Sequence, residues 1–245
     1  MANTTYSEFK EKLTNVFTLC GIDVPTDEKK INKLYELAEL LTDYGKNVNL
    51  TAITDTDGII LKHFADCAVL CDAVPDGARV IDVGAGGGFP SLPLAILRDD
   101  VRVISLDSTA KKLSFIDLAA QKLSLANIST MHARAEEAAN GVLRGTLDFV
   151  CARAVAALPV LSELCLPFVK KGGVFCAMKA DSGQELEACK NTFAKLGGEL
   201  EGVREINLTD GTETLHRTLI TVRKTGATPK QYPRKYSNIK AKPLI

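Results

Sequence analysis

The sequence predicts an α/β fold built around a mostly parallel, seven-stranded sheet. From residue 79 onward, short apolar runs alternate with amphipathic segments, an order typical of parallel strands joined by helices on both faces of a sheet. The last two apolar runs, 203–208 and 214–224, are separated only by a polar turn and predict an antiparallel pair at one edge. Residues 1–74 carry helical periodicity instead, so we expect a helical N-terminal extension.

Three helices are predicted within this extension. In the first two, apolar residues recur at helical spacing: Phe9, Leu13, Val16 and Phe17, followed by Ile31, Leu34, Leu37, Ala38 and Leu41. The third is expected over 58–71. Pro25 and the turn-like segment 55–58 separate the three helices.

The remaining elements divide into a sheet domain, 75–224, and a basic tail, 225–245. The predicted strands are 79–84, 102–107, 128–133, 147–153, 173–179, 203–208 and 214–224. The predicted helices of this domain are 91–99, 110–124, 158–172 and 187–197. The last twenty residues have little periodicity and are expected to form an extended tail.

Composition excludes several classes of protein. Lysine plus arginine and aspartate plus glutamate each number 30, so the net charge does not indicate a polyanionic partner. The seven cysteines form no C-x-x-C pair and the chain has only three histidines, so no metal site is expected. Unpaired cysteines, a polar N-terminus and the lack of a membrane-length apolar run lead us to expect a cytoplasmic protein. No additional apolar stripe stands out, so we expect a monomer.

A glycine-rich turn follows the first predicted strand, in the segment VIDVGAGGGFP. Gly84 and Gly86 allow a ligand to approach the backbone closely, at the edge of the sheet where nucleotides bind. A dinucleotide fingerprint would need a third glycine where Phe89 stands, so the pattern favours S-adenosylmethionine (SAM) over NAD. A tight turn without any ligand is the alternative.

Acidic residues follow the next two predicted strands. Asp107 ends the second strand, where a carboxylate can accept hydrogen bonds from a ribose diol. Ala135 and Glu136 follow the third strand, where a backbone N–H and a carboxylate can meet an adenine edge. The alternatives are a helix cap for Asp107 and a solvated side chain for Glu136.

The order of these motifs resembles the RsmG family, the bacterial 16S rRNA guanine-N7 methyltransferases also called glucose-inhibited division protein B. The resemblance covers about residues 35–245 and implies the class I SAM-dependent methyltransferase fold, which is Rossmann-like. It is carried by DVGAGGGFPSLPLAI, LDSTAKKLSFI, RAEE, CARAVA, LCLPFVKKGG, MKA, YPRK and KPL.

The resemblance also implies a set of cofactor contacts. The positions that match the family's SAM site are Gly84, Phe89, Asp107, Ser108, Thr109, Ala135, Glu136 and Arg153. The tail departs from the family, which usually carries glycine and proline after YPRK, whereas this chain has Tyr236 there.

Three residues are candidates for positioning the reactants. Arg153, after the fourth strand, could bind the SAM carboxylate or the O6 edge of a guanine, or pair with a nearby acid. Lys179, after the fifth strand, could meet a phosphate or remain solvated. His63 could line the pocket, although a packed core histidine is the favoured interpretation.

Guanine N7 carries a lone pair and no proton, so methylating it requires alignment rather than a general base. The sequence accordingly contains no histidine in a catalytic spacing. RNA binding is expected from the C-terminal region, which has no acidic residue after Glu213. The candidates are Arg223, Lys224, Lys230, Arg234, Lys235, Lys240 and Lys242. A solubilising tail is the alternative.

The sequence therefore supports a SAM-dependent methyltransferase that modifies N7 of one guanine in 16S rRNA, as naked RNA or within the small ribosomal subunit. Two alternatives remain: a SAM enzyme with another acceptor, and a non-enzymatic RNA-binding assembly factor. An NAD enzyme ranks behind both.

Overall fold

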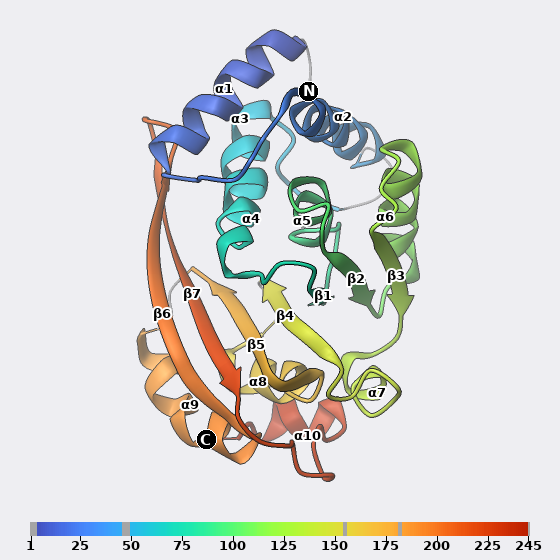
Figure 1. Ribbon diagram of the computed structural model, residues 1–245, viewed down its shortest axis with the longest axis vertical. Coiled ribbons are helices and arrows are strands. Elements are labelled where there is room, and N and C mark those ends of the chain that lie inside the picture. Colours follow the sequence, from blue (N-terminus) through green and yellow to red (C-terminus); the bar gives the residue numbers. More distant parts are fainter. Residues whose placement is uncertain (1–3, 46–49, 154–155, 181–182, 245) are drawn as a thin grey trace.

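A computed structural model describes residues 4–45, 50–153, 156–180 and 183–244. One seven-stranded sheet runs through it in the order β3-β2-β1-β4-β5-β7-β6 (Figure 1). The strands are β1 (Arg79–Val83), β2 (Arg102–Asp107), β3 (Ile128–His132), β4 (Leu147–Arg153), β5 (Val169–Lys179), β6 (Gly198–Thr209) and β7 (Thr214–Lys224). The predicted sheet, with its antiparallel C-terminal edge, is confirmed.

The strand order reverses beside β1. This strand pairs in parallel with β2 on one side and with β4 on the other, with Val80 opposite both Val103 and Phe149. Ligands of open α/β sheets bind beyond the carboxyl ends of strands at such a reversal. At the far side of the sheet, β7 runs antiparallel to both β5 and β6, so its first residues reach the same edge as the end of β5.

Helices cover both faces of the sheet (Figure 1). They are α1 (Tyr6–Leu19), α2 (Glu28–Gly45), α3 (Thr56–Ile59), α4 (Asp66–Ala68), α5 (Ser91–Leu97), α6 (Ala110–Lys122), α7 (Ala135–Ala138), α8 (Leu158–Cys165), α9 (Gly183–Lys195) and α10 (Tyr236–Ala241). The N-terminal helices share one hydrophobic core with α5, α6 and one face of the sheet. Helices α8 to α10 pack on the opposite face.

The N-terminal helices bury the apolar positions that the sequence indicated. Phe9, Leu13 and Leu34 are completely buried, as the helical spacing requires. The prediction of one regular helix over 58–71 is wrong. The chain passes from α3 through a π-helical segment, η1 (Ile60–Ala65), into α4, and a 3₁₀ turn, η2 (Cys71–Ala73), follows. Such π segments frequently occur at functional sites.

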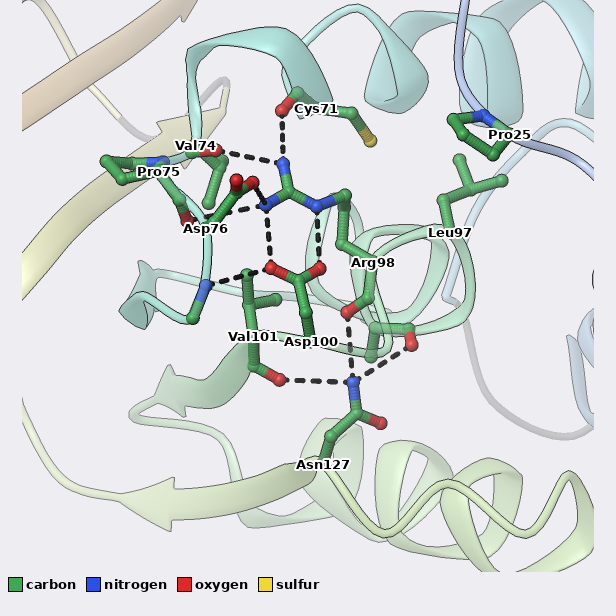
Figure 2. A network of polar contacts seen from close by, with 12 residues as sticks. Pro25, Cys71, Val74, Pro75, Asp76, Leu97, Arg98, Asp100, Val101 and Asn127 are labelled. Atoms are coloured by element: carbon green, nitrogen blue, oxygen red, sulfur yellow. Dashed lines mark hydrogen bonds and ion pairs between the residues drawn. The ribbon is translucent and has the colours of Figure 1, made fainter.

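A polar network around Arg98 joins this extension to the sheet domain (Figure 2). The guanidinium of Arg98 donates to the carbonyls of Cys71 and Val74, at 2.8 and 2.9 Å, and pairs with Asp76 and Asp100. Nearby, the Asn127 amide donates to three carbonyls of 95–101. The network therefore fixes the amino-terminal edge of the sheet.

Several boundaries differ from those predicted: α9 begins four residues before 187, and β6 begins at Gly198 instead of residue 203. The helix expected over 158–172 ends at Cys165, because Pro167 cannot continue a helix, and β5 then begins at Val169. The tail was wrongly expected to be extended. It contains α10 and packs against α8, with Ile239 completely buried. Within the described part of the chain, no helix is both long and apolar enough to cross a membrane.

Candidate active site

A large cavity, of about 970 Å³, opens at the carboxyl ends of the parallel strands. All the predicted cofactor residues line it, and so do His63 and Lys179. The volume lies at the upper end of the range for small-molecule sites in proteins, which is about 300 to 1,000 Å³. The cavity can therefore hold a nucleoside-sized cofactor and leave room for a second reactant.

The glycine turn forms the floor of the cavity. The amides of Gly84 and Ala85 both donate to the Leu106 carbonyl, at 2.8 and 3.0 Å, which locks the turn against the end of β2. Gly84 and Gly86 adopt positive φ angles of 78° and 57°. At Gly88, which has φ 87°, a Cβ atom would lie 2.5 Å from Leu92 Cδ1. Glycine is needed here both for the turn and for the close approach of α5.

Asp82, on β1, lies behind this turn and bonds to the start of α5. Its carboxylate is completely buried and accepts a hydrogen bond from the Ser91 amide at 3.2 Å. No described residue donates to its other oxygen, Oδ1. Burial raises the pKa of Asp82 to about 7, because a carboxylate without water is disfavoured in its charged form.

Asp107 occupies the position expected for a ribose-binding carboxylate. Its Oδ2 accepts from the Gly86 amide at 2.9 Å and its Oδ1 from the Thr109 amide at 2.8 Å. These bonds join the turn after β1 to the start of α6 and hold the side chain at the wall of the cavity. A carboxylate oxygen accepts two hydrogen bonds, so each oxygen can still accept one from a ribose hydroxyl. Thus Asp107 holds the turn that leads to Thr109, the N-cap of α6, and is still available to a ligand.

Ala135 and Glu136 begin α7 and lie on the same wall, with Ser108 and Thr109 beside them. The first amides of a helix have no acceptor within the helix, so these N–H groups can serve a ligand. The Glu136 carboxylate accepts from Arg134 Nε at 2.9 Å. Its orientation is therefore fixed by an ion pair.

The opposite wall is aromatic. The His63 and Phe89 rings are stacked, with centroids 4.4 Å apart and planes 19° from parallel. His63 Nε2 lies 2.9 Å from the Thr51 hydroxyl, and the histidine is 6% exposed. Burial, together with the nearby charge of Arg153, lowers the pKa of His63 to about 3. His63 is thus both a packed core residue and part of the cavity wall, and it is uncharged at neutral pH.

Arg153 lies on this wall too, with its guanidinium 5.6 Å from the Phe89 ring centre. Its Nη1 donates to Asp66 Oδ2 at 2.8 Å and to the Lys62 carbonyl at 3.1 Å. The other Asp66 oxygen accepts from Arg217 Nε at 2.7 Å. A buried carboxylate from α4 therefore holds two arginines, one from β4 and one from β7, beside the same cavity.

Lys179 is also paired. Its ammonium contacts Glu185 at 2.8 Å and donates to the Ala156 carbonyl at 3.2 Å. The phosphate contact expected for Lys179 stays a prediction, and these partners would compete with it.

The basic candidates of the C-terminal region fall into two groups. Because β7 is antiparallel, Arg223 and Lys224 lie at the amino-terminal end of β5, away from the cavity. Lys224 is 3% exposed and donates to the Leu196 carbonyl, and Arg234 pairs with the completely buried Glu163. These two side chains serve the fold, which corrects their assignment to RNA. The exposed candidates are Lys230, Lys235, Lys240 and Lys242.

Among the cavity residues that sequence reasoning did not select are Asp66, Arg134, Arg217 and Tyr236. In the sequence, Asp66 stands out only as a neighbour of His63. Arg217 is one basic residue among many. Arg134 stood beside the selected Ala135 and Glu136, and Tyr236 was visible as a departure in the tail. All four line the cavity. The topology that brings α4, β7 and α10 to one edge of the sheet has no local sequence signal.

Known proteins are similar to this chain in sequence and in fold. Residues 30–213 match the family described as GidB, rRNA small subunit methyltransferase G. Ribosomal RNA small subunit methyltransferase G of Clostridium perfringens is 43% identical over 228 residues, 91% of this chain and 95% of that relative. The protein of the same name from Acetivibrio thermocellus is 42% identical, with 91% and 93% covered. The chain belongs to this family.

Solved structures support the fold of this GidB-family chain. The crystal structure of M. jannaschii TYW2 in complex with AdoMet aligns with a TM-score of 0.55 at 17% identity, covering 71% of this chain and 79% of that one. At such low identity the likeness concerns the class I methyltransferase fold alone. The predicted fold class and family are therefore confirmed.

The cavity also fits the cofactor expected of a GidB-family protein. It offers a glycine turn with Phe89 at the third fingerprint position, a carboxylate with free acceptor positions and a wall with unused amides. No feature is suited to a pyrophosphate, since Phe89 fills the space that a dinucleotide fingerprint reserves for glycine. This donor and acceptor set suits SAM better than NAD.

Proposed function

We propose that this chain is a SAM-dependent methyltransferase that modifies N7 of a guanine in 16S rRNA. The observation that carries the proposal is the convergence of the family-type motifs on one cavity at the strand-order reversal. The match to the small subunit methyltransferase G family over residues 30–213 supports the same acceptor.

The cofactor half of the site is assigned to the wall built from β1, β2 and α7. Asp107 would accept hydrogen bonds from the ribose hydroxyls, with Ser108 and Thr109 beside it, and the turn at Gly84 and Gly86 would lie under the amino-acid part. Ala135 and Glu136 would meet the adenine edge. When bound, SAM supplies a methyl group that its sulfonium has already activated.

The acceptor half is assigned to the wall of Phe89, His63 and the two arginines held by Asp66. Guanine N7 needs no general base, and the lowered pKa of His63 makes that residue a weak base in any case. An arginine that donated to N7 would block the reaction, so Arg153 or Arg217 would donate to O6 instead. The task of these residues is to hold N7 in line with the methyl group.

The RNA backbone would be held by cations outside this acceptor wall. Lys230, Lys235, Lys240 and Lys242 are exposed on the C-terminal segment, and Lys112 lines the cavity mouth. Such side chains neutralise phosphates without reading sequence. They would therefore bind 16S rRNA, alone or within the small subunit, while the cavity selects the base.

We further propose that the enzyme acts as a monomer in the cytoplasm. Among the described residues, the large apolar side chains that are exposed, Leu19, Val142 and Val203, lie on separate elements. Exposed apolar side chains that occur singly are ordinary on protein surfaces and do not by themselves mark an interface.

The test is incubation with methyl-labelled SAM and small subunits or 16S RNA from a strain that lacks this enzyme, with the parent strain's material as control. We expect label in 7-methylguanosine from the first material only, because the parent's site is already modified. Label in another nucleoside would contradict the N7 assignment. No label, despite cofactor binding, would contradict rRNA methylation.

A further inference from the structure

One residue of the C-terminal segment, Tyr236, lines the cofactor cavity. It is the first residue of α10 and lines the cavity together with Arg134, Ala135 and Glu136. Helix α10 lies beside α8, which in turn contacts α7 (Figure 1). We call residues 228–244 the C-terminal strap.

An ion pair anchors this strap at its centre. Glu163 of α8 is completely buried, and its carboxylate accepts from the Arg234 amide, Nε and Nη2 at 2.6 to 2.9 Å. A buried carboxylate without a partner is strongly unfavourable, so Glu163 requires Arg234 in place. This anchor lies two residues before Tyr236.

Further bonds hold both ends of the strap. Arg144 donates to the carbonyls of Tyr232 and Thr228, at 2.8 and 3.0 Å. Near the other end, the Thr192 hydroxyl donates to the Leu244 carbonyl at 2.6 Å. Between them Ile239 is completely buried. The strap is thus a docked element of the fold, which limits where the Tyr236 ring can lie.

Tyr236 is connected to the adenine side of the cavity through Arg134. The Arg134 guanidinium lies over the Tyr236 ring, 5.4 Å from its centre, and its Nε pairs with Glu136 at 2.9 Å. An arginine over an aromatic ring is held by a cation–π attraction. The ring therefore supports the arginine that orients Glu136.

We propose that the C-terminal strap forms the adenosine-side wall of the cofactor cavity, with Tyr236 as its cofactor-contacting residue. This inference rests on the proposed cofactor, and the ligand it concerns is the adenosine part of SAM or S-adenosylhomocysteine. Tyr236 belongs to the segment 236–238, where this chain departs from the glycine and proline that the family usually carries after YPRK. Docking of the strap and cofactor binding are consequently linked, and each stabilises the other.

The first test is calorimetric titration of S-adenosylhomocysteine into Tyr236→Ala. Loss of the ring removes a wall and frees Arg134, so we expect about tenfold weaker binding, equivalent to about 1.4 kcal/mol. No described residue bonds the Tyr236 hydroxyl, so Tyr236→Phe is expected to bind as the wild type does. Ser237→Ala, at an exposed neighbouring position, is the matched control. Unchanged affinity in Tyr236→Ala would overturn the proposal.

The second test releases the strap without leaving a charge unpaired. The double variant Glu163→Gln with Arg234→Met is expected to speed amide hydrogen exchange across 228–244 and to weaken S-adenosylhomocysteine binding about as much as Tyr236→Ala does. In the wild type, S-adenosylhomocysteine is expected to slow exchange in this segment. Faster exchange with unchanged affinity would show that strap and cofactor are independent, against the proposal.

These measurements use no RNA, so they can contradict the role of the strap without contradicting the proposed function. Tyr236-dependent binding in a protein that methylates another acceptor would overturn only the rRNA assignment. Formation of 7-methylguanosine without any Tyr236 effect would overturn only the role of the strap.

Discussion

Arg98 and Arg153 lie at opposite edges of the sheet and use their hydrogen-bond donors differently. At the amino-terminal edge, every N–H-bearing nitrogen of Arg98 has an acceptor, among them the Cys71 and Val74 carbonyls and the Asp100 carboxylate (Figure 2). At the carboxyl edge, Arg153 Nη1 has two acceptors, whereas Nε has none among the described residues.

The difference separates a structural arginine from a candidate functional one. Both side chains are mostly buried and both pair with a carboxylate, with 15% and 19% of the side chain exposed. Burial and ion pairing therefore do not identify a site by themselves. What distinguishes Arg153 is an unused donor on the wall of a cavity, where a ligand can complete its bonding.

The strongest test of this contrast makes the same substitution at both positions. Arg98→Lys is expected to lower the free energy of unfolding by about 3 kcal/mol, because a lysine cannot replace the guanidinium's bonds to several carbonyls. Denaturant unfolding measures this, with Arg102→Lys, at an exposed position on β2, as the control. S-adenosylhomocysteine affinity of the folded protein is expected to stay unchanged. A stability equal to the wild type would remove the structural role of Arg98.

Arg153→Lys is expected to have the reverse effect. A lysine can still pair with Asp66, so the melting temperature is expected to change little. Loss of the planar donor is expected to lower kcat/KM for rRNA methylation by about 100-fold. Initial rates with saturating SAM and varied rRNA give this value. If Arg153→Lys kept the wild-type kcat/KM and lost stability, Arg153 would be a structural arginine as Arg98 is.

His63 gives a smaller, pH-dependent effect at the carboxyl edge. Its folded-state pKa of about 3 lies below the ordinary 6.5, so the unfolded chain binds a proton that the native state does not. Its contribution to stability is complete above pH 6.5 and is lost as the pH falls towards 3. The loss at pH 5 is about 2 kcal/mol.

We expect His63→Gln to lack this acid-side loss, measured by unfolding at pH 8 and pH 5. Asp82, whose folded-state pKa is raised to about 7, acts in the opposite direction, since its penalty grows as the pH rises from 3.8. The Asp82 contribution is the same in the wild type and in His63→Gln, so it cancels when the two are compared. His216→Gln, at an exposed position, should keep the wild-type dependence. Equal pH dependence in His63→Gln and wild type would show that His63 is not held neutral.

The smallest expected effect is that of Asp107→Asn. An amide oxygen can still accept from one backbone N–H, but the charge that strengthens a bond to a ribose hydroxyl is lost. S-adenosylhomocysteine affinity is expected to fall about tenfold, or about 1.4 kcal/mol. Asp99→Asn, an exposed carboxylate between α5 and β2, is the control. An unchanged dissociation constant would leave Asp107 only its structural bonds to the Gly86 and Thr109 amides.

The sequence predicted the helices and strands better than the tertiary contacts between them. Periodicity located all seven strands and the buried faces of α1 and α2, because those signals are local. The glycine turn and Asp107 were found because they follow strands directly. The pairing of Arg217 with Asp66 depends on β7 being antiparallel, and no short-range pattern carries that information.

The same reason explains the errors in the basic region. A count of lysines and arginines cannot distinguish Lys235, which is exposed, from Lys224, which is buried against the Leu196 carbonyl. It also placed Arg234 with the RNA contacts, although Glu163 on a distant helix holds it. Charge patterns predict that a partner is anionic, and only the tertiary fold shows which charges are free to meet it.

The position of α1 has a consequence for how the protein folds during synthesis. This helix is made before the sheet, yet it packs on β6, and the Thr209 amide donates to Cys20 Sγ at 3.2 Å. Likewise, α2 buries Leu34, Leu37 and Leu41 in a core that includes α5 and α6. In a nascent chain α1 and α2 can pack on each other early, but the part of α1 that packs on β6 has no partner until the C-terminal strands have emerged. Such long-range closure slows folding and exposes the intermediate to aggregation, so the time between synthesis of α1 and of β6 sets the period of greatest risk.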